Sequence, residues 1–378
     1  MDATRRSSKS GRGGERQPQS GRRLSRLAIL AVAPLVAGLA LSPAFAAPSP
    51  ARTAAKPHQA AKPATPANPA APAPATTTGQ QPDLAFGAFQ RGYYITAFSL
   101  ATQNAAQGNA PSMTLLGELY ANGLGVPQDD KKAEQWYKLA AARGDANAMF
   151  ALAMFRMEGR NGPRDRVKSA KWLAEAAKLG HPIAAYDLAL LYIEGELFPQ
   201  SFTRAAELLR EAAQAGNAQA QYALGTLYKQ GRGVPKNMRE AVRLFALASL
   251  GDETEAEVEY GIALFNGDGV TRNQPLAASL FRKAALKGNP IAQDRLAVIL
   301  AHGLGIPANP VEAAKWHLVS KAAGETDLDL DDFVSRLDPK TRAAAEQEAK
   351  PWIAAVQQEI AAKMREVSSA APAPTPAK

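Results

Sequence analysis

The chain has 378 residues, a formal net charge of +9 and no cysteine. The lack of cysteine excludes disulfides, thiolate metal sites, cysteine nucleophiles and a lipid-modified N-terminal cysteine. The positive charge alone would suggest a nucleic-acid partner, but it is concentrated in residues 1–82, and the rest of the chain is close to neutral. We therefore expect no nucleic acid among the partners.

Residues 1–46 have the composition of an export signal. An arginine-rich start precedes an apolar run over 27–41, and Ala44-Phe45-Ala46 offers small residues for cleavage. The run is shorter than the roughly 20 apolar residues of a membrane span. We predict a cleaved signal and a periplasmic or secreted protein that has no membrane span after cleavage. An uncleaved signal that anchors the chain to the inner membrane is the alternative.

Residues 47–82 consist mainly of Ala, Pro and Thr, and a similar composition returns over 368–378. Such segments have little apolar surface to bury. We therefore predict a disordered linker before the folded body and a disordered tail after it.

The folded body repeats with a constant period. A glycine recurs every 36 residues without insertion or deletion, at Gly123, Gly159, Gly195, Gly231, Gly267 and Gly303. A fixed period of this length is typical of stacked two-helix units, whose first and second helices we call helix A and helix B. Glycine at this position is expected to end helix A with left-handed backbone geometry.

Other positions keep the same period and mark the start of helix B. One column contains only residues that cap helix N-termini, namely Asp129, Asp165, Ser201, Asn237, Asn273 and Asn309. On helix A, a large apolar column that begins with Leu116 is followed by a column of Gly or Ala that begins with Gly117. On helix B, small residues recur from Ala133 and from Ala140, spaced so that they share one buried face.

The segments "LGELYANGLGVPQDDKKAEQWYKLAAARGDANA" and "LAVILAHGLGIPANPVEAAKWHLVSKAAG" resemble the Sel-1-like repeat family, which is related to tetratricopeptide repeats. The resemblance implies an all-α fold, a right-handed α-solenoid of stacked antiparallel helix pairs that binds other proteins. We predict six repeats over 109–324, a degenerate N-terminal repeat over 83–108 and a C-terminal helical cap over 325–367, with Asp338-Pro339 at the start of its long helix.

Signals for chemistry are weak. The sequence has no Gly-x-Ser-x-Gly, His-Glu-x-x-His or Walker-type motif. Of its four histidines, His302 and His317 could meet in space, but two histidines without a third ligand are poor evidence for a metal. The acidic run from Asp327 to Asp332 lacks the glycine that a calcium loop needs, so helix caps and a solvated loop explain it better. We predict no enzyme activity, no metal and no cofactor.

A partner-binding surface is predicted on helix A of units two to four. If helix A lines the inner face of the solenoid, its non-core positions there form an apolar stripe of aromatic, methionine and aliphatic side chains. The stripe comprises Phe150, Met154, Met157, Tyr186, Leu190, Ile193 and Tyr222. The alternative is that tightly curved stacks bury this stripe as core.

The turns of the same region are irregular. Four units carry a second glycine two residues after the first, but Asn161 and Leu197 take its place in units two and three. Asn tolerates left-handed geometry and Leu does not readily adopt it. The predicted function is a non-enzymatic interaction scaffold of the cell envelope, whose partner is a sensor-kinase ectodomain or another envelope protein. The alternative is a protein that binds or cleaves peptidoglycan.

Overall fold

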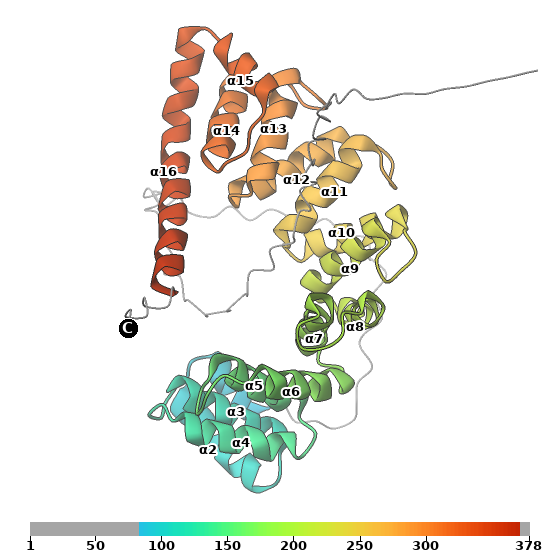
Figure 1. The fold of residues 1–378 in the computed structure, drawn as a ribbon. Helices are drawn as coiled ribbons and strands as arrows, with labels where there is room; N and C mark the ends of the chain where they lie inside the picture. Colours follow the sequence, from blue (N-terminus) through green and yellow to red (C-terminus); the bar gives the residue numbers. More distant parts are fainter. Residues whose placement is uncertain (1–82, 371–378) are drawn as a thin grey trace, which may run out of the picture. The chain divides into compact units, whose positions relative to one another are not determined.

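The computed structural model describes residues 83–370, and the segments predicted as signal, linker and most of the tail lie outside this range. Within the described range the chain forms sixteen α-helices and no strand. Figure 1 shows that successive helices lie antiparallel in pairs and that each pair packs against the next. This arrangement is the α-solenoid that the sequence period predicts.

Six helix pairs make up the regular part of the stack. They are α3 (Ala110–Asn122) with α4 (Asp130–Ala141), α5 (Ala146–Glu158) with α6 (Arg166–Lys178), α7 (Pro182–Glu194) with α8 (Phe202–Gln214), α9 (Ala218–Gln230) with α10 (Met238–Leu250), α11 (Thr254–Asn266) with α12 (Gln274–Leu286), and α13 (Pro290–His302) with α14 (Pro310–Ala322). Odd numbers are helices A and even numbers are helices B.

The turn between helix A and helix B has the geometry that its residues predict. All six glycines of the 36-residue column follow a helix A and have positive φ, between +66° at Gly123 and +87° at Gly267. All six residues of the predicted capping column accept a hydrogen bond from the backbone N–H three positions later, as Asp129 does from Lys132. Left-handed glycine and side-chain caps together satisfy the free backbone groups at both sides of the turn.

A second capping column was not predicted. It precedes helix A, and Asn109, Asp145, His181, Asn217 and Asn289 each cap their helix through the side chain. His181 caps through Nδ1, which accepts from the N–H of Ala184 at 3.1 Å. Glu253, at the same position before α11, makes no side-chain cap bond. The repeat is therefore capped at both of its helix starts, with one exception.

The predicted columns lie in the core, and one of their members is partly exposed. Every small residue of the two helix B columns, from Ala133 to Ala313 and from Ala140 to Ser320, is buried. In the large helix A column, Leu116 and its equivalents are buried except for Tyr260, which is half-buried. Close approach of a small-residue face to a large-residue face is what stacks each pair.

Both ends of the stack depart from the repeat. At the N-terminal end α1 (Leu84–Gln90) pairs with α2 (Tyr94–Ala106). Gly87 lies 36 residues before Gly123, but it falls inside α1, and Gly92, with φ of +79°, takes the left-handed position instead. The turn of this pair is thus shifted along the chain relative to the six regular units.

At the C-terminal end α15 (Leu328–Ser335) leads into α16 (Pro339–Ala370), which lies along α14. Asp338 caps α16 through its side chain, as expected from the Asp-Pro pair. The helix continues through Pro351 to Ala370, past residue 367. Trp352 of α16 packs edge-on against the buried Trp316 of α14, with ring centroids 5.1 Å apart, so α16 covers the last repeat.

Candidate partner-binding face

The seven residues of the predicted stripe lie on three consecutive helices A, and all seven are half-buried. Phe150, Met154 and Met157 come from α5, Tyr186, Leu190 and Ile193 from α7, and Tyr222 from α9. Four of them, Phe150, Met154, Tyr186 and Ile193, pack partly against the buried core. The stripe therefore has one side in contact with core residues and keeps part of its surface accessible.

Two aromatic members of the stripe are held by neighbouring elements. The ring of Phe150 stacks on His181 of the next unit, with centroids 4.6 Å apart and planes 20° apart. Burial lowers the pKa of His181, consistent with a neutral ring whose Nδ1 accepts the cap bond. Tyr222 lies 5.9 Å from the buried Phe245 of α10. These contacts fix ring orientation before any partner arrives, which lowers the entropy cost of binding.

Acidic side chains on or beside this face were missed by the sequence reasoning. Burial raises the pKa of Asp187, which follows Tyr186 on α7, to about 6. Burial and a hydrogen bond with Glu255 raise the pKa of Glu253, at the start of α11, to about 7. A signal existed in the sequence, because Asp187 stands in a column whose previous members are Leu115 and Ala151. The face thus combines tyrosines with carboxyl groups that are costly to ionise.

The second glycine of the turn determines how regular units meet. A Cβ added at Gly125, Gly233, Gly269 or Gly305 would stand less than 3.0 Å from an atom of the first residue of the preceding helix B. The turn backbone therefore rests directly on the start of the previous unit's second helix, an approach that leaves no room for a side chain.

The two units without this glycine use charged side chains at the same contact. Asn161 has left-handed geometry with φ of +52°, whereas Leu197 does not, as the residue types predict. The first residues of the preceding helices B are here Asp130 and Arg166. Arg166 forms ion pairs with Glu194 at 2.9 Å and Glu196 at 2.7 Å.

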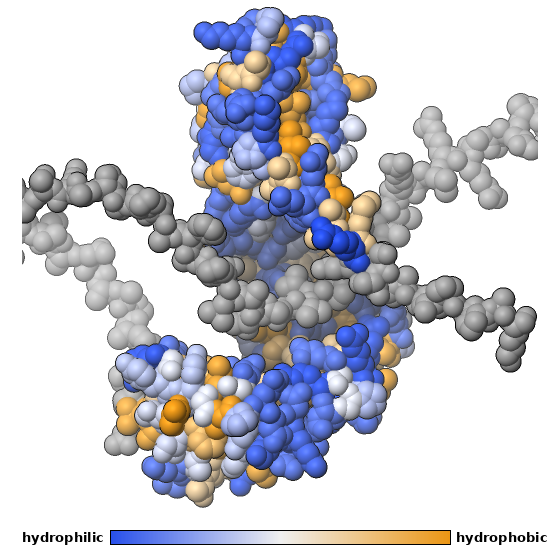
Figure 2. All heavy atoms as spheres, turned by 90° about the vertical axis from the view of Figure 1, so that its left-hand side faces the viewer, coloured by the Kyte–Doolittle hydropathy of each residue, from blue (hydrophilic) through white to orange (hydrophobic). Residues whose placement is uncertain are grey.

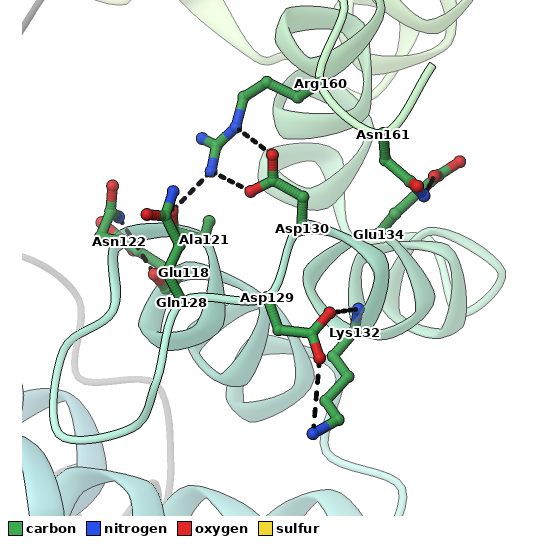
Figure 3. Close-up of polar contacts among 10 residues, drawn as sticks. All are labelled: Glu118, Ala121, Asn122, Gln128, Asp129, Asp130, Lys132, Glu134, Arg160 and Asn161. Carbon is green, nitrogen blue, oxygen red and sulfur yellow. Dashed lines mark hydrogen bonds and ion pairs between the residues drawn. The ribbon is translucent and has the colours of Figure 1, made fainter.

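Figure 3 shows the first of these joints in detail. Arg160 forms an ion pair with Asp130 and also donates to the carbonyl oxygen of Ala121 at the end of α3. Asn161 donates from its amide to the carboxylate of Glu134 on α4. Side chains of one turn thus bond to both helices of the preceding unit. At these two joints charged side chains therefore link the turn to the preceding unit.

The same face is hollowed further along the stack. A cavity of about 210 Å³ opens between α11 and α13, two units beyond the centre of the predicted stripe. Its walls are apolar side chains such as Ile262, Phe265 and Val298, and Arg295 stands at its edge. No residue of this unit was predicted from the sequence as part of a binding site.

Apolar side chains on the face that Figure 2 shows form small patches between polar ones. Narrow patches of this kind are usual for a protein surface. The described part of this side of the protein therefore offers no broad apolar surface as a binding site, and the half-buried stripe and the cavity are the candidate binding sites.

The histidines and acids that were considered for chemistry have structural contacts. His317 is buried, and its Nε2 lies 2.8 Å from Asp331. His302 is exposed beside Asp329 and Asp332, and Asp327 caps α15. Among residues 83–370, no group of three or more His, Cys, Asp or Glu side chains is arranged to hold a metal ion. In the same range no helix combines the length and the apolarity needed to cross a bilayer.

The fold and the face define a helical repeat protein of the α-solenoid class. The model of the Sel1 repeat family matches six consecutive segments, 110–145, 146–181, 182–217, 218–252, 254–289 and 290–324. The chain therefore belongs to the Sel1 repeat family. Proteins with these repeats are generally non-enzymatic scaffolds for protein interaction.

Two solved structures share the fold at similar levels of identity. One is c5321, a protective antigen of uropathogenic Escherichia coli, which is 27% identical with a TM-score of 0.52 over 75% of this chain and 69% of its own. The other is a Sel1 repeat protein from Oxalobacter formigenes, 27% identical with a TM-score of 0.54 over 65% of this chain and 100% of its own. A search of curated proteins gives no match.

Proposed function

We propose that this protein is an exported scaffold that binds another protein through the helix A face of α5, α7 and α9. The observation that carries the proposal is the half-burial of all seven stripe residues, because a closed core would bury them completely. Aromatic and methionine side chains with accessible surface suit an amphipathic helix or an extended apolar peptide. Membership of a family of interaction scaffolds supports the same class of function.

The location in the periplasm rests on residues 1–46, whose basic start, apolar run and small residues match an export signal. A partner must then be accessible outside the cytoplasm. We propose the ectodomain of a sensor kinase or another envelope protein as that partner.

The test replaces apolar residues on the face with charged ones. Met154→Lys and Leu190→Lys are compared with the matched controls Leu179→Lys and Leu286→Lys, which alter leucines that are 52% and 55% exposed outside the stripe. After crosslinking in intact cells and mass spectrometry, an envelope protein should be recovered with the wild type and both controls. It should be absent with the two stripe variants, while their circular dichroism and melting stay unchanged.

Two outcomes would contradict the proposal. Loss of folding in the stripe variants would mean that the stripe is core. Retention of the purified protein on isolated cell wall, with release of wall fragments, would favour the alternative of a peptidoglycan-cleaving protein.

A further inference from the structure

The cavity between α11 and α13 differs from the corresponding place one unit earlier. Because the period is 36 residues, Phe265 and Arg295 occupy the positions that Lys229 and Glu259 occupy at the joint of α9 and α11. There the ammonium of Lys229 lies 2.6 Å from the carboxylate of Glu259, and this pair spans the two helices A. At the α11–α13 joint a phenyl ring and a guanidinium face the same space, and no such pair can form.

The replacement leaves an empty apolar space and, among the described residues, an unpaired positive charge at the same place. The first is apolar space, a cavity of about 210 Å³ walled by Ile262, Phe265, Phe281 and Val298. The second is the guanidinium of Arg295, which is exposed and forms no ion pair with any side chain that the structure describes. An unpaired cation at the edge of an apolar cavity is suited to a ligand with an apolar group next to an anion.

The floor of the cavity is rigid. The ring of Phe281 lies so close to Gly261 that an added Cβ would stand 2.8 Å from Phe281 Cε1, and Phe281 is only 1% exposed. The walls come from three continuous helices, α11, α12 and α13, so the cavity exists before a ligand binds. A preformed cavity lowers the cost of ordering on binding.

We propose that this cavity binds the C-terminal residue of a polypeptide that ends in a large apolar side chain. The side chain fills the space between α11 and α13, and the terminal carboxylate pairs with Arg295, supplying the anion that Glu259 supplies one unit earlier. In a C-terminal residue the side chain and the carboxylate are bonded to the same Cα. Their close spacing matches a single small cavity with one cation at its edge. Guanidinium binds carboxylate through two parallel hydrogen bonds, so the contact is directional.

This inference rests on the proposed function in that it assigns peptide binding to the helix A face, but it uses different residues. The stripe of α5, α7 and α9 is tested by Met154 and Leu190, and the cavity is tested by Arg295. Variants at Met154 or Leu190 can therefore abolish binding of the envelope protein while Arg295 still binds the peptide, and the reverse, so failure of one proposal is distinguishable from failure of the other.

The experiment measures binding of short fluorescent peptides to the purified protein by anisotropy. The probe is an N-terminally fluorescein-labelled Gly-Ser-Gly-Ser-Gly-Phe with a free carboxylate. Its comparison peptides are the same sequence amidated, a version that ends in Gly, and an amidated version with an internal Phe-Glu. We expect the free-carboxylate Phe peptide to bind at least about tenfold more tightly than each comparison peptide. The amidated peptide lacks the carboxylate, the peptide that ends in Gly lacks the apolar group, and the Phe-Glu peptide carries its carboxylate on a different residue from its phenyl ring.

Variants locate the site. Arg295→Gln should weaken binding of the Phe peptide at least about tenfold, and Arg295→Lys should restore part of it as a point charge. Lys229→Gln, which alters the equivalent joint one unit earlier, is the matched control and should leave binding unchanged. Arg295 is exposed, so melting curves of its variants should coincide with that of the wild type.

Three results would overturn the proposal. They are absence of binding by the Phe peptide, equal binding of its acid and amide forms, and unchanged binding in Arg295→Gln. Preference for the internal Phe-Glu peptide would show that a side-chain carboxylate is the ligand and would reject the terminal residue.

Discussion

The ring of Phe245 on α10 lies directly over Gly225 on α9, so that a Cβ added to Gly225 would stand 2.7 Å from Phe245 Cε1. The same relationship holds between Tyr137 and Gly117 and between Phe281 and Gly261. In the other three units the paired positions hold alanine on helix A with Leu173, Leu209 or His317 on helix B. Large rings thus face glycine, and smaller side chains face alanine.

This pairing predicts the effect of a methyl group. Gly225→Ala should destabilise the protein by about 1–3 kcal/mol because the methyl group overlaps the ring. The sign is diagnostic, since the same change in an unconstrained helix stabilises by about 0.5–1 kcal/mol. Phe245→Leu added to Gly225→Ala recreates the Ala189–Leu209 pair of the preceding unit and should recover part of the loss. Urea unfolding of the four proteins gives the coupling, and additive effects would contradict the pairing.

The backbone geometry at Asn161 and Leu197 predicts that alanine and glycine variants have opposite orders of stability at the two positions. Asn161 has φ of +52°, so Asn161→Ala keeps a Cβ in a left-handed conformation, without the amide that makes asparagine tolerant of it, and should be less stable than Asn161→Gly by about 1 kcal/mol. Both variants lose the bond to Glu134, and the comparison therefore isolates the backbone. Leu197, at the same turn position one unit later, lacks positive φ. There the alanine variant should be at least as stable as the glycine variant, and the same order at both positions would contradict the assignment.

The period, the turn glycines and the helix B caps were predictable because each is a local requirement that recurs six times. A left-handed residue after helix A needs glycine at Gly123 and its equivalents, and a cap needs a short polar side chain. The first helix pair was predicted less well, since Gly87 matches the period but lies inside α1. One matching residue carries little information when its flanking turn residues do not match.

The site was harder to predict for a different reason. Which residues lie on helix A follows from the period, and the seven stripe residues are half-buried, but their binding of a partner stays a prediction. The cavity at Arg295 depends on the loss of an ion pair between two helices, and the burial of Asp187 depends on the packing of its neighbours. Comparing Lys229 and Glu259 with Phe265 and Arg295 at a spacing of 36 could have found the first.

Replacing Glu253 at the start of α11 should stabilise the protein by an amount that depends on pH. Glu253 occupies a cap position without a cap bond, and burial together with Glu255 raises its pKa to about 7 from the ordinary 4.5. The folded state therefore holds the proton more tightly than the unfolded state, and the stability that this gives is lost as pH rises through about 7. Glu253→Asn, which copies Asn217 and Asn289, should stabilise the protein by about 1 kcal/mol through the cap.

The stabilisation by Glu253→Asn should be larger at pH 8 than at pH 5, because only the wild type has lost its proton at the higher pH. Urea unfolding at both pH values measures the difference. Glu253→Gln serves as the control, since it removes the titrating group and provides a poorer cap. A gain of equal size at pH 5 and pH 8 would mean that Glu253 does not titrate between them.

The packing of α16 on α14 predicts that loss of this contact unfolds the stack locally, at its C-terminal end. Trp352 packs on the buried Trp316, and the ammonium of Lys315 lies 4.6 Å from one ring and 5.6 Å from the other. Trp352→Ala removes this contact and should cost about 3 kcal/mol, at the lower end for tryptophan because the side chain is half-buried. In a solenoid each unit contacts only its neighbours, so the loss should be local. Hydrogen exchange should accelerate in α14 and α16 and stay unchanged in α3 and α4.

Ile360→Ala, further along α16 at a side chain that is 40% exposed, is the control and should leave exchange in α14 unaltered. Unchanged protection of α14 in Trp352→Ala would show that α16 does not stabilise the last repeat, and equal acceleration throughout would show that the stack opens as one unit.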